Sequence, residues 1–448
     1  MYKKILLALI LISTTIQSQT AVMGTMDPIS ENYKYAILYQ LKGAKQIYIA
    51  NVTVVEGAFK IDFPENTSKG MYRITYDMKN GGFVDFLYNK ENVALKFDPT
   101  FPSGTLEFLT SEENKIYTSY QNKTNELRKE LDSLQLSFFN LKDETEKTKT
   151  GNLYIKNYEN YLNAQQLFEQ QAKGKLAYNF IKSSNKYYAP TLINKPQEYL
   201  NSEKQHYFDF IDFYDSMLLN SIFYTEKITD YVFYLNRSDD LDVQNKLYIN
   251  AINDVLDKIN DNYSLKAEIL TSVMFNFAQL QNTVVLEYVI ENYYKKLPIE
   301  FQNDADIKEI QSKVKLAIGK TAPDFSFDFE GKSVKLSQLE NASTYILVFW
   351  STSCSHCLLE VPQLYEFTKD KEKIHVVAIA LENDELGFNK HTQKFEKWTH
   401  VLGLNKWENK IAKEYEIVAT PTYFILDSNK KIISKPEFFK DVKAFFEN

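Results

Sequence analysis

The sequence predicts a multidomain protein with an N-terminal antiparallel β-sandwich, an all-α middle region and a C-terminal α/β domain. The length of 448 residues, at the usual ~150 residues per domain, suggests three domains, and the texture of the apolar pattern changes twice along the chain. Hydrophobic residues make up 44% and charged residues 25% of the chain, which excludes wholesale disorder. With only 13 Gly and 11 Pro, collagen-like and linker-dominated architectures are excluded as well.

Residues 1–20 have the pattern of a secretory signal peptide. Lys3 and Lys4 precede an apolar run from Ile5 to Ile12, and a polar stretch through Ser18 follows. The run is too short to span a bilayer, which takes ~20 apolar residues. No cysteine follows it, so we expect no lipid anchor. The pattern predicts an exported, periplasmic protein.

Residues 30–110 consist of short runs in which apolar and polar residues alternate. Examples are residues 46–50, 58–63 and 93–97, and turn formers such as Asn80-Gly81-Gly82 separate the runs. Regular short strands with these breaks are typical of a small antiparallel β-sandwich. Nothing in this segment indicates catalysis.

Residues 111–315 favour helices because turn formers become rare and apolar residues recur at helical spacing. Leu127, Leu131 and Leu134 show this spacing. The helix breaks expected in this all-α domain lie at Gly151, Pro190, Pro196 and Pro298.

Residues 318–448 alternate between strand and helix patterns. An apolar strand at Tyr345–Phe349 leads to a helix that begins at Cys354, and a second strand spans Val376–Leu381. A continuous apolar strand followed by a helix is typical of a buried, partly parallel sheet. Further elements are expected as helical turns near 390–397 and 408–415, strands at 422–426 and 431–434, and a last helix at 436–446.

The two cysteines of the chain both lie in the motif Cys354-Ser355-His356-Cys357, so a disulfide-stapled scaffold is excluded. Two thiols at positions i and i+3 of a first helical turn can close a small disulfide ring. The first sulfur also faces the unpaired N–H groups of the helix N-terminus, which stabilise a thiolate. Cys354 is therefore the predicted nucleophile of thiol–disulfide exchange, and Cys357 is the predicted resolving thiol.

His356 lies between the two cysteines and is predicted to tune their redox potential. A neighbouring imidazole stabilises the thiolate and makes the pair more oxidising. The alternative is a solvent-facing histidine with little effect. A structural zinc site is poorly supported because no second group of Cys and His residues lies nearby. We expect neither a metal nor an organic cofactor.

The C-terminal motifs together resemble the thioredoxin fold of the TlpA/ResA-like branch of thiol–disulfide oxidoreductases. Besides the cysteine pair, the resemblance depends on the strand Tyr345–Trp350, on Glu360-Val361-Pro362 and on Ala419-Thr420-Pro421-Thr422. Residues 319–325 match the extra N-terminal strands of that branch. The resemblance covers residues 318–448, and the two preceding regions resemble, more weakly, those that precede such domains in exported proteins of Bacteroidota.

The resemblance implies roles for individual residues. Pro421 matches the family's cis-proline, which shapes the groove where a substrate backbone docks, and Thr420 would offer main-chain hydrogen bonds there. Trp350, at the end of the strand in this motif, is also assigned to substrate binding. Glu360 matches a buried glutamate of the branch, and it lies three residues beyond Cys357 on the same helix. Its carboxylate could therefore take a proton from the deeper thiol.

Two positions depart from the family pattern. Val348 stands where many thioredoxins carry a buried aspartate, which leaves proton transfer to Glu360. Ser353 stands where many carry a tryptophan, which changes the shape of the docking surface.

These features predict an exported thiol–disulfide oxidoreductase that acts on protein disulfides or dithiols and needs a membrane or periplasmic redox partner. The resemblance favours the reductase direction, whereas His356 leans toward an oxidase or isomerase. The alternative is a non-catalytic binding or adaptor protein built on a thioredoxin-fold platform. A peroxiredoxin is disfavoured because Leu347 and Ser351 occupy the positions of its Pro and Thr. The net charge of −7 means that the protein as a whole does not attract a polyanion, so we expect no nucleic-acid partner.

Overall fold

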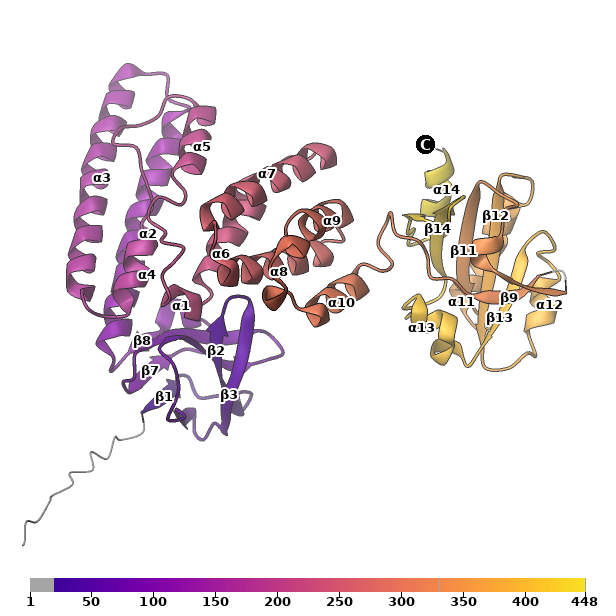
Figure 1. Cartoon of the computed structure of the whole chain (residues 1–448), viewed down its shortest axis with the longest axis horizontal. Helices are drawn as coiled ribbons and strands as arrows, with labels where there is room; N and C mark the ends of the chain where they lie inside the picture. Colours follow the sequence, from indigo (N-terminus) through magenta and orange to yellow (C-terminus); the bar gives the residue numbers. More distant parts are fainter. Residues whose placement is uncertain (1–19, 330, 448) are drawn as a thin grey trace, which may run out of the picture. The chain divides into compact units, whose positions relative to one another are not determined.

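A computed structural model of the chain describes residues 20–329 and 331–447 (Figure 1). The predicted signal peptide at 1–20 therefore lies, except for Thr20, outside the described residues. The chain divides into two compact units, one up to Ser272 and one from Val273 onward. Within the described residues, no helix has the length and apolar character needed to cross a membrane.

Two four-stranded sheets form the first part of the chain, in the orders β4-β1-β7-β8 and β3-β2-β5-β6. Their buried side chains share one core, to which Val22 and Leu95 contribute from one sheet and Leu38 and Ile74 from the other. The strands are β1 (Ala21–Met26), β2 (Tyr35–Lys42), β3 (Lys45–Thr53), β4 (Ala58–Asp62), β5 (Gly70–Asp77), β6 (Gly82–Tyr88), β7 (Val93–Phe97) and β8 (Glu107–Phe108).

Strand β1 corrects the prediction of a purely antiparallel arrangement within 30–110. It begins at Ala21, ahead of the predicted boundary, and it pairs in parallel with β7, where Val22 lies opposite Val93. The local alternation of apolar residues indicates a strand but not its direction. That direction depends on pairing between segments far apart in the sequence.

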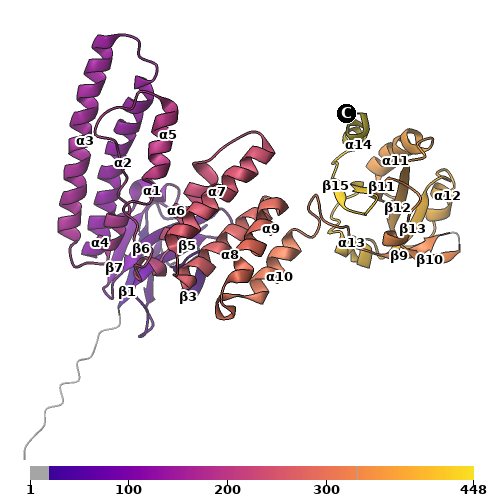
Figure 2. The same cartoon turned by 45° about the horizontal axis from the view of Figure 1, so that its top comes forward.

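Helices occupy residues 111–315, all of which the structure describes. The two longest, α2 and α3, lie side by side (Figures 1 and 2), and Leu127 and Leu131 of α2 share a buried cluster with Tyr154 and Tyr161 of α3. After the short α1 (Pro102–Thr105), the helices are α2 (Glu112–Phe138), α3 (Glu144–Ala172), α4 (Ala177–Ser183), α5 (Pro196–Gln205), α6 (Phe223–Thr229), α7 (Leu241–Ile259), α8 (Tyr263–Gln279), α9 (Thr283–Asn292) and α10 (Asp304–Lys313).

Gly151 does not break a helix as predicted, because it lies inside α3. A Cβ atom built at this position would meet no other atom within 4 Å, so the glycine faces open space. A glycine in a helix interior costs only about 1 kcal/mol relative to alanine, and the long helix tolerates it.

A five-stranded sheet in the order β13-β12-β11-β14-β15 organises the C-terminal part. Strands β11, β12 and β13 run parallel, and β14 runs antiparallel to both of its neighbours. The strands are β11 (Thr344–Trp350), β12 (Ile374–Glu382), β13 (Thr399–Leu404), β14 (Thr422–Asp427) and β15 (Ile432–Ser434), preceded by the hairpin of β9 (Ser326–Phe329) and β10 (Lys332–Lys335). The helices are α11 (Ser355–Thr368), α12 (Phe388–Thr392), α13 (Lys410–Glu414) and α14 (Phe439–Glu447).

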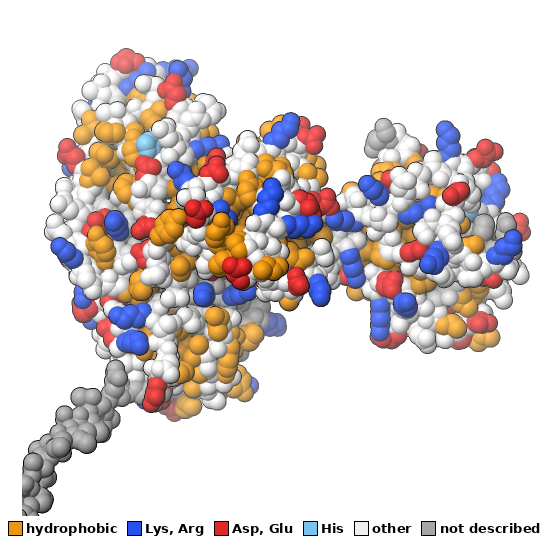
Figure 3. Space-filling model, in the orientation of Figure 1, with side chains coloured by type: hydrophobic (Ala, Val, Ile, Leu, Met, Phe, Trp, Pro, Cys, Tyr) orange, Lys and Arg blue, Asp and Glu red, His pale blue; other side chains and the backbone are white. Residues whose placement is uncertain are grey.

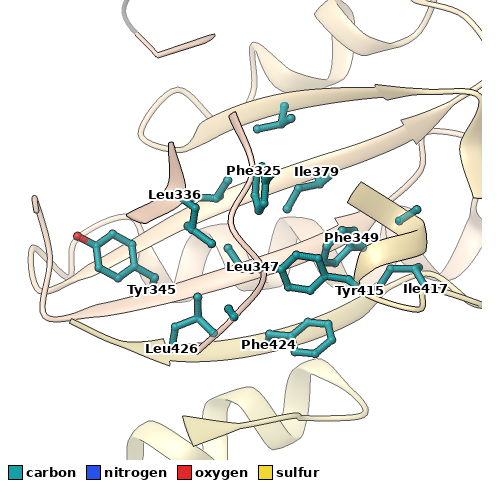
Figure 4. Close-up of a cluster of buried hydrophobic side chains, with 14 of the residues drawn as sticks. Phe325, Leu336, Tyr345, Leu347, Phe349, Ile379, Tyr415, Ile417, Phe424 and Leu426 are labelled. Atoms are coloured by element: carbon teal, nitrogen blue, oxygen red, sulfur yellow. The ribbon is translucent and has the colours of Figure 1, made fainter. Parts of the chain in front are cut away.

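Strand β11 is buried on both faces, because its alternate side chains enter two different cores. Tyr345, Leu347 and Phe349 join the core that Figure 4 shows, which also contains Tyr415 and Phe424. The core on the other face contains side chains of β11, α11 and α14, namely Ile346, Val348, Trp350, Cys357, Val361, Leu364 and Val442. Helix α11, which carries the cysteine motif, is thereby fixed against the centre of the sheet.

The surface carries charges of both signs. On the face that Figure 3 shows, basic and acidic side chains are interspersed, and hydrophobic side chains lie among them.

Candidate active site

Cys354 lies where the polypeptide leaves β11 and enters α11. It is the N-cap residue of the helix, with extended backbone angles of φ −95° and ψ 114°. The backbone N–H of Cys357 donates a hydrogen bond to the Cys354 sulfur over 3.1 Å. A helix N-terminus leaves N–H groups without intrahelical partners, and here the sulfur takes the place that a hydroxyl or carboxylate oxygen occupies in an ordinary N-cap.

The two cysteines form a disulfide with a Cα–Cα distance of 5.2 Å, and they differ in accessibility. Cys357 is fully buried at 0% exposure in the core beneath α11, whereas Cys354 is only partly buried. An incoming sulfur atom can therefore reach Cys354 but not Cys357.

Thr420 and Pro421 lie directly beside the disulfide. The Thr420–Pro421 peptide bond is cis, and the Thr420 carbonyl oxygen lies 3.3 Å from the Cys354 sulfur. The sheet explains this proximity, because β14 pairs with β11 and brings Thr422 opposite Phe349. Two segments far apart in the sequence thus meet at the reactive sulfur.

Glu360 lies on α11 after the second cysteine, and its half-buried carboxylate connects three elements. Its Oε2 atom accepts a hydrogen bond from the Tyr423 hydroxyl and another from the Phe439 backbone N–H, each over 2.9 Å. Burial and the nearby carboxylate both raise the pKa of Tyr423 far above its ordinary value, so Tyr423 remains a protonated donor. In this oxidised form no hydrogen bond joins the Glu360 carboxylate to the sulfur of Cys357.

The remaining predicted residues, His356 and Trp350, make no side-chain hydrogen bond to the Cys354 sulfur. His356 is exposed on the first turn of α11. Trp350 is 1% exposed and packs against Phe395 with a centroid distance of 6.2 Å. A side chain so deeply buried offers no surface to a docked substrate, so the prediction of direct substrate binding by Trp350 does not fit the structure. Trp350 instead belongs to the buried core that underlies the loop with Cys354.

Three residues near Cys354 escaped the sequence prediction. Glu382, at the end of β12, is 6% exposed and accepts hydrogen bonds from the Thr352 backbone N–H over 2.5 Å and from the Ser351 hydroxyl over 3.3 Å. Lys406 and Trp407 approach from the connection between β13 and α13, and together with Cys354 they line a cavity of about 190 Å³. The position of Glu382 directly after an apolar strand was a usable signal, but nothing in the sequence pointed to Lys406 or Trp407.

No group of three or more His, Cys, Asp or Glu side chains is arranged to hold a metal ion within the part of the chain that the structure describes.

The sheet order, the dithiol motif that opens a helix and the Thr420-Pro421 segment beside it define a redox protein of the thioredoxin class. A thioredoxin-like family model matches residues 341–432. The chain is 32% identical over 126 residues to the thiol-disulfide oxidoreductase ResA of a Bacillus cereus strain, and the match covers 28% of this chain and 71% of that protein. It is 34% identical over 131 residues to the ResA protein of Bacillus anthracis, with coverage of 28% and 71%.

The chain therefore belongs to the thioredoxin-like thiol–disulfide oxidoreductases of the TlpA/ResA-like branch, which confirms the resemblance. This membership supports an oxidoreductase that acts on protein thiols rather than a non-catalytic platform.

Two solved structures are similar to the C-terminal part of the chain. The thioredoxin domain of a thiol-disulfide oxidoreductase from Bacteroides vulgatus is 28% identical, covers 29% of this chain and 98% of that one, and has a TM-score of 0.25. A thiol:disulfide interchange protein from Bacteroides sp. is 25% identical, with coverage of 30% and 93% and a TM-score of 0.26.

Proposed function

We propose that the protein is an exported, periplasmic reductase of disulfides in protein substrates, and that Cys354 and Cys357 carry the reaction. The observation that supports this proposal is the asymmetry of the pair. The Cys354 sulfur is partly exposed, accepts the Cys357 N–H and lies beside the Thr420 carbonyl oxygen, whereas Cys357 is fully buried. We assign the redox chemistry to a domain at 318–448, preceded by domains at 30–110 and 111–315.

The reaction begins with the reduced pair. The Cys354 thiolate attacks one sulfur of the substrate disulfide, so a bond forms between Cys354 and the substrate while the substrate S–S bond breaks and one substrate thiolate leaves. The Cys357 thiol then loses its proton and attacks the Cys354 sulfur, which closes the intramolecular disulfide and releases the second substrate thiolate. Two electrons pass from the cysteine pair to the substrate. A membrane or periplasmic dithiol protein must return them for the next cycle.

The neighbouring residues have supporting roles in this scheme. The free N–H groups at the start of α11 stabilise the Cys354 thiolate, and we assign the exposed His356 an additional tuning role. Glu360 accepts the proton of Cys357, since a carboxylate three residues further along a helix shares a face with the thiol. Thr420 and Pro421 present backbone groups to the substrate. Val418, which is 89% exposed, adds an apolar contact for a protein partner next to them.

Trapping of substrates tests the proposal. The full-length Cys357→Ala variant lacks the resolving thiol, so substrates should remain attached to Cys354 as mixed disulfides that dithiothreitol releases. The Cys354→Ala/Cys357→Ala double variant is the matched control and should trap nothing. Absence of adducts on the single variant, at equal amounts of exported protein, would refute catalysis by this pair.

Two further measurements test the direction and the location. A reductase should have a reduction potential near the value of about −270 mV known for thioredoxin, whereas a value near about −120 mV would indicate an oxidase. Cell fractionation should find the protein in the periplasm, and N-terminal sequencing should show that about the first 20 residues have been removed. A cytoplasmic protein with an intact N-terminus would contradict export.

A further inference from the structure

The cavity beside the disulfide is placed to receive part of a substrate. Its volume is about 190 Å³, and Cys354 and Thr420 line it together with Lys406 and Trp407. Cys354 is the predicted attacking group and Thr420 the predicted backbone contact. A side chain next to the reactive cysteine of a docked substrate would therefore enter this cavity, whose size suits one side chain.

Lys406 supplies a positive charge that is not neutralised. The Lys406 side chain is half-buried as a whole, and its ammonium donates one hydrogen bond, over 3.1 Å, to the Ser353 hydroxyl at an exposed position. No carboxylate lies within ion-pairing distance of this ammonium among the described residues, whereas Lys413, in the helix that follows, pairs with Glu408. An ammonium carries three N–H donors, so two of them remain available to a ligand.

The backbone holds Lys406 in place before any ligand arrives. Asn405 and Lys406 both adopt left-handed conformations, with φ values of 70° and 44°, which are unfavourable for a lysine. The turn persists because the Asn409 backbone N–H donates to the Lys406 carbonyl oxygen over 3.1 Å and the Asn409 side chain donates to the Leu404 carbonyl oxygen over 3.0 Å. The turn therefore fixes the Cα position of Lys406 beside the cavity that its side chain lines.

The Glu382 carboxylate beneath this region already accepts hydrogen bonds from the cysteine loop. Glu382 accepts the Thr352 backbone N–H and the Ser351 hydroxyl, and the Ser351 and Ser353 hydroxyls lie 2.9 Å apart. Two serines therefore separate Glu382 from Lys406. This hydrogen-bonded chain fixes the loop before Cys354 and leaves the ammonium without a counter-ion of its own.

We propose that this cavity is a subsite for an acidic side chain, Asp or Glu, that flanks the reactive cysteine of the protein substrate. Lys406 pairs with its carboxylate, and Trp407 forms an apolar wall along its methylene groups. The inference rests on the proposed function and adds the substrate preference of the same site.

The test uses the full-length protein and three disulfide peptides that differ only in the residue next to the cysteine, which is Glu, Gln or Lys. For the pre-reduced wild-type protein in a single turnover, the second-order rate constant of peptide reduction should be highest for the Glu peptide and about tenfold lower for the Lys peptide, as for a charge-assisted hydrogen bond. Lys406→Gln should bring the Glu-to-Lys ratio close to one, and Lys406→Glu should invert it. Lys410→Gln removes an exposed charge of α13 that does not line the cavity, and it should leave the ratio unchanged.

Each outcome decides between the two proposals. If Cys357→Ala traps no substrate protein and the reduced wild-type protein reduces none of the three peptides, the proposed function itself fails. If the wild-type protein reduces all three peptides equally well, or if Lys406→Gln keeps the wild-type ratio, only the subsite is refuted. An equal loss for all three peptides in Lys406→Gln, with a changed pH profile of Cys354 alkylation, would assign Lys406 to the thiolate and would also overturn the subsite.

Discussion

We expect Glu360 to stabilise the fold as well as to accept a proton. Its replacement by alanine should measurably lower the free energy of unfolding of the C-terminal α/β region. Its Oε2 atom accepts hydrogen bonds from Tyr423 and from the Phe439 backbone, each over 2.9 Å. The substitution leaves both donors without a partner, and Tyr423 is only 1% exposed.

The magnitude follows from the two bonds. A hydrogen bond to a charged group contributes ~1.5–3 kcal/mol, and we take the lower end because Glu360 is only half-buried. Glu360→Ala should therefore lower the free energy of unfolding by about 3 kcal/mol. Glu360→Gln keeps an oxygen that can accept both bonds, although neutral bonds are about half as strong, so the expected loss is about 1–1.5 kcal/mol.

Urea denaturation of the oxidised full-length protein, followed by tryptophan fluorescence, measures these losses. All three tryptophans, Trp350, Trp398 and Trp407, lie in the C-terminal part, so the signal follows this region. Glu366→Ala is the matched control on the same helix. Glu366 is exposed and pairs with Lys369, and its loss should cost less than about 0.5 kcal/mol.

Two results would refute this reasoning about stability. One is an equal loss for Glu360→Ala and Glu366→Ala. The other is a Glu360→Gln variant as unstable as Glu360→Ala, which would mean that the hydrogen bonds do not decide the effect.

The same Glu360→Gln variant also tests proton transfer. If Glu360 takes the proton of Cys357, release of the mixed disulfide should slow by roughly 10²-fold or more, while the fold stays largely intact. An unchanged release rate would leave Glu360 with its structural role alone.

Three other substitutions test the described contacts. Burial lowers the pKa of His375 to about 4, and Asn341 donates to its Nδ1 atom over 3.1 Å. In the unfolded chain a histidine takes up a proton near pH 6.5, whereas folded His375 does so only near pH 4. The free energy of unfolding should therefore keep its full value above pH 6.5 and decrease as the pH falls from 6.5 toward 4. His375→Gln should abolish about 1–2 kcal/mol of this pH dependence in urea titrations. Arg73 donates two hydrogen bonds to Asp85, over 2.7 and 2.8 Å. Arg73→Ala should therefore lower the free energy of unfolding of the N-terminal sheets by about 3 kcal/mol, measured by circular dichroism with the tryptophan transition of the C-terminal part as internal reference. A loss below about 1 kcal/mol would contradict this. Lys430 is 5% exposed and donates hydrogen bonds to two backbone carbonyl oxygens. Lys430→Met should therefore lower the free energy of unfolding by about 2 kcal/mol. An unchanged urea midpoint of the tryptophan fluorescence would show that those bonds contribute nothing.

Local patterns were enough to predict the elements that present the cysteine motif. Strand β11 is an uninterrupted apolar run, and the following helix begins within one residue of the predicted start. Strand β13 was missed, because Thr399–Leu404 is short and only half of its side chains are buried. Its pairing with β12 stabilises it as a strand, and that contact is not visible in the local sequence.

The residues around the motif were only partly predictable. Glu382 lies at the same sheet edge as the cysteine loop because β11 and β12 run parallel, with Trp350 opposite Ala380, and residues after neighbouring parallel strands meet at one edge. Lys406 comes from a turn after a strand that itself was missed. Its role therefore could not be inferred before the sheet was known.

The sequence by itself determined the cysteine pair, because both thiols lie within one turn at the start of one helix and their spacing is a local property of the chain. Only the tertiary structure decided which sulfur a substrate can reach and what surrounds it. The packing of α11 on the sheet buries Cys357, the register of β14 against β11 brings Thr420 to Cys354, and the connection after β13 brings Lys406 into the same cavity. Burial and contacts between distant segments follow from how the strands pair, and this pairing is a property of the whole sheet.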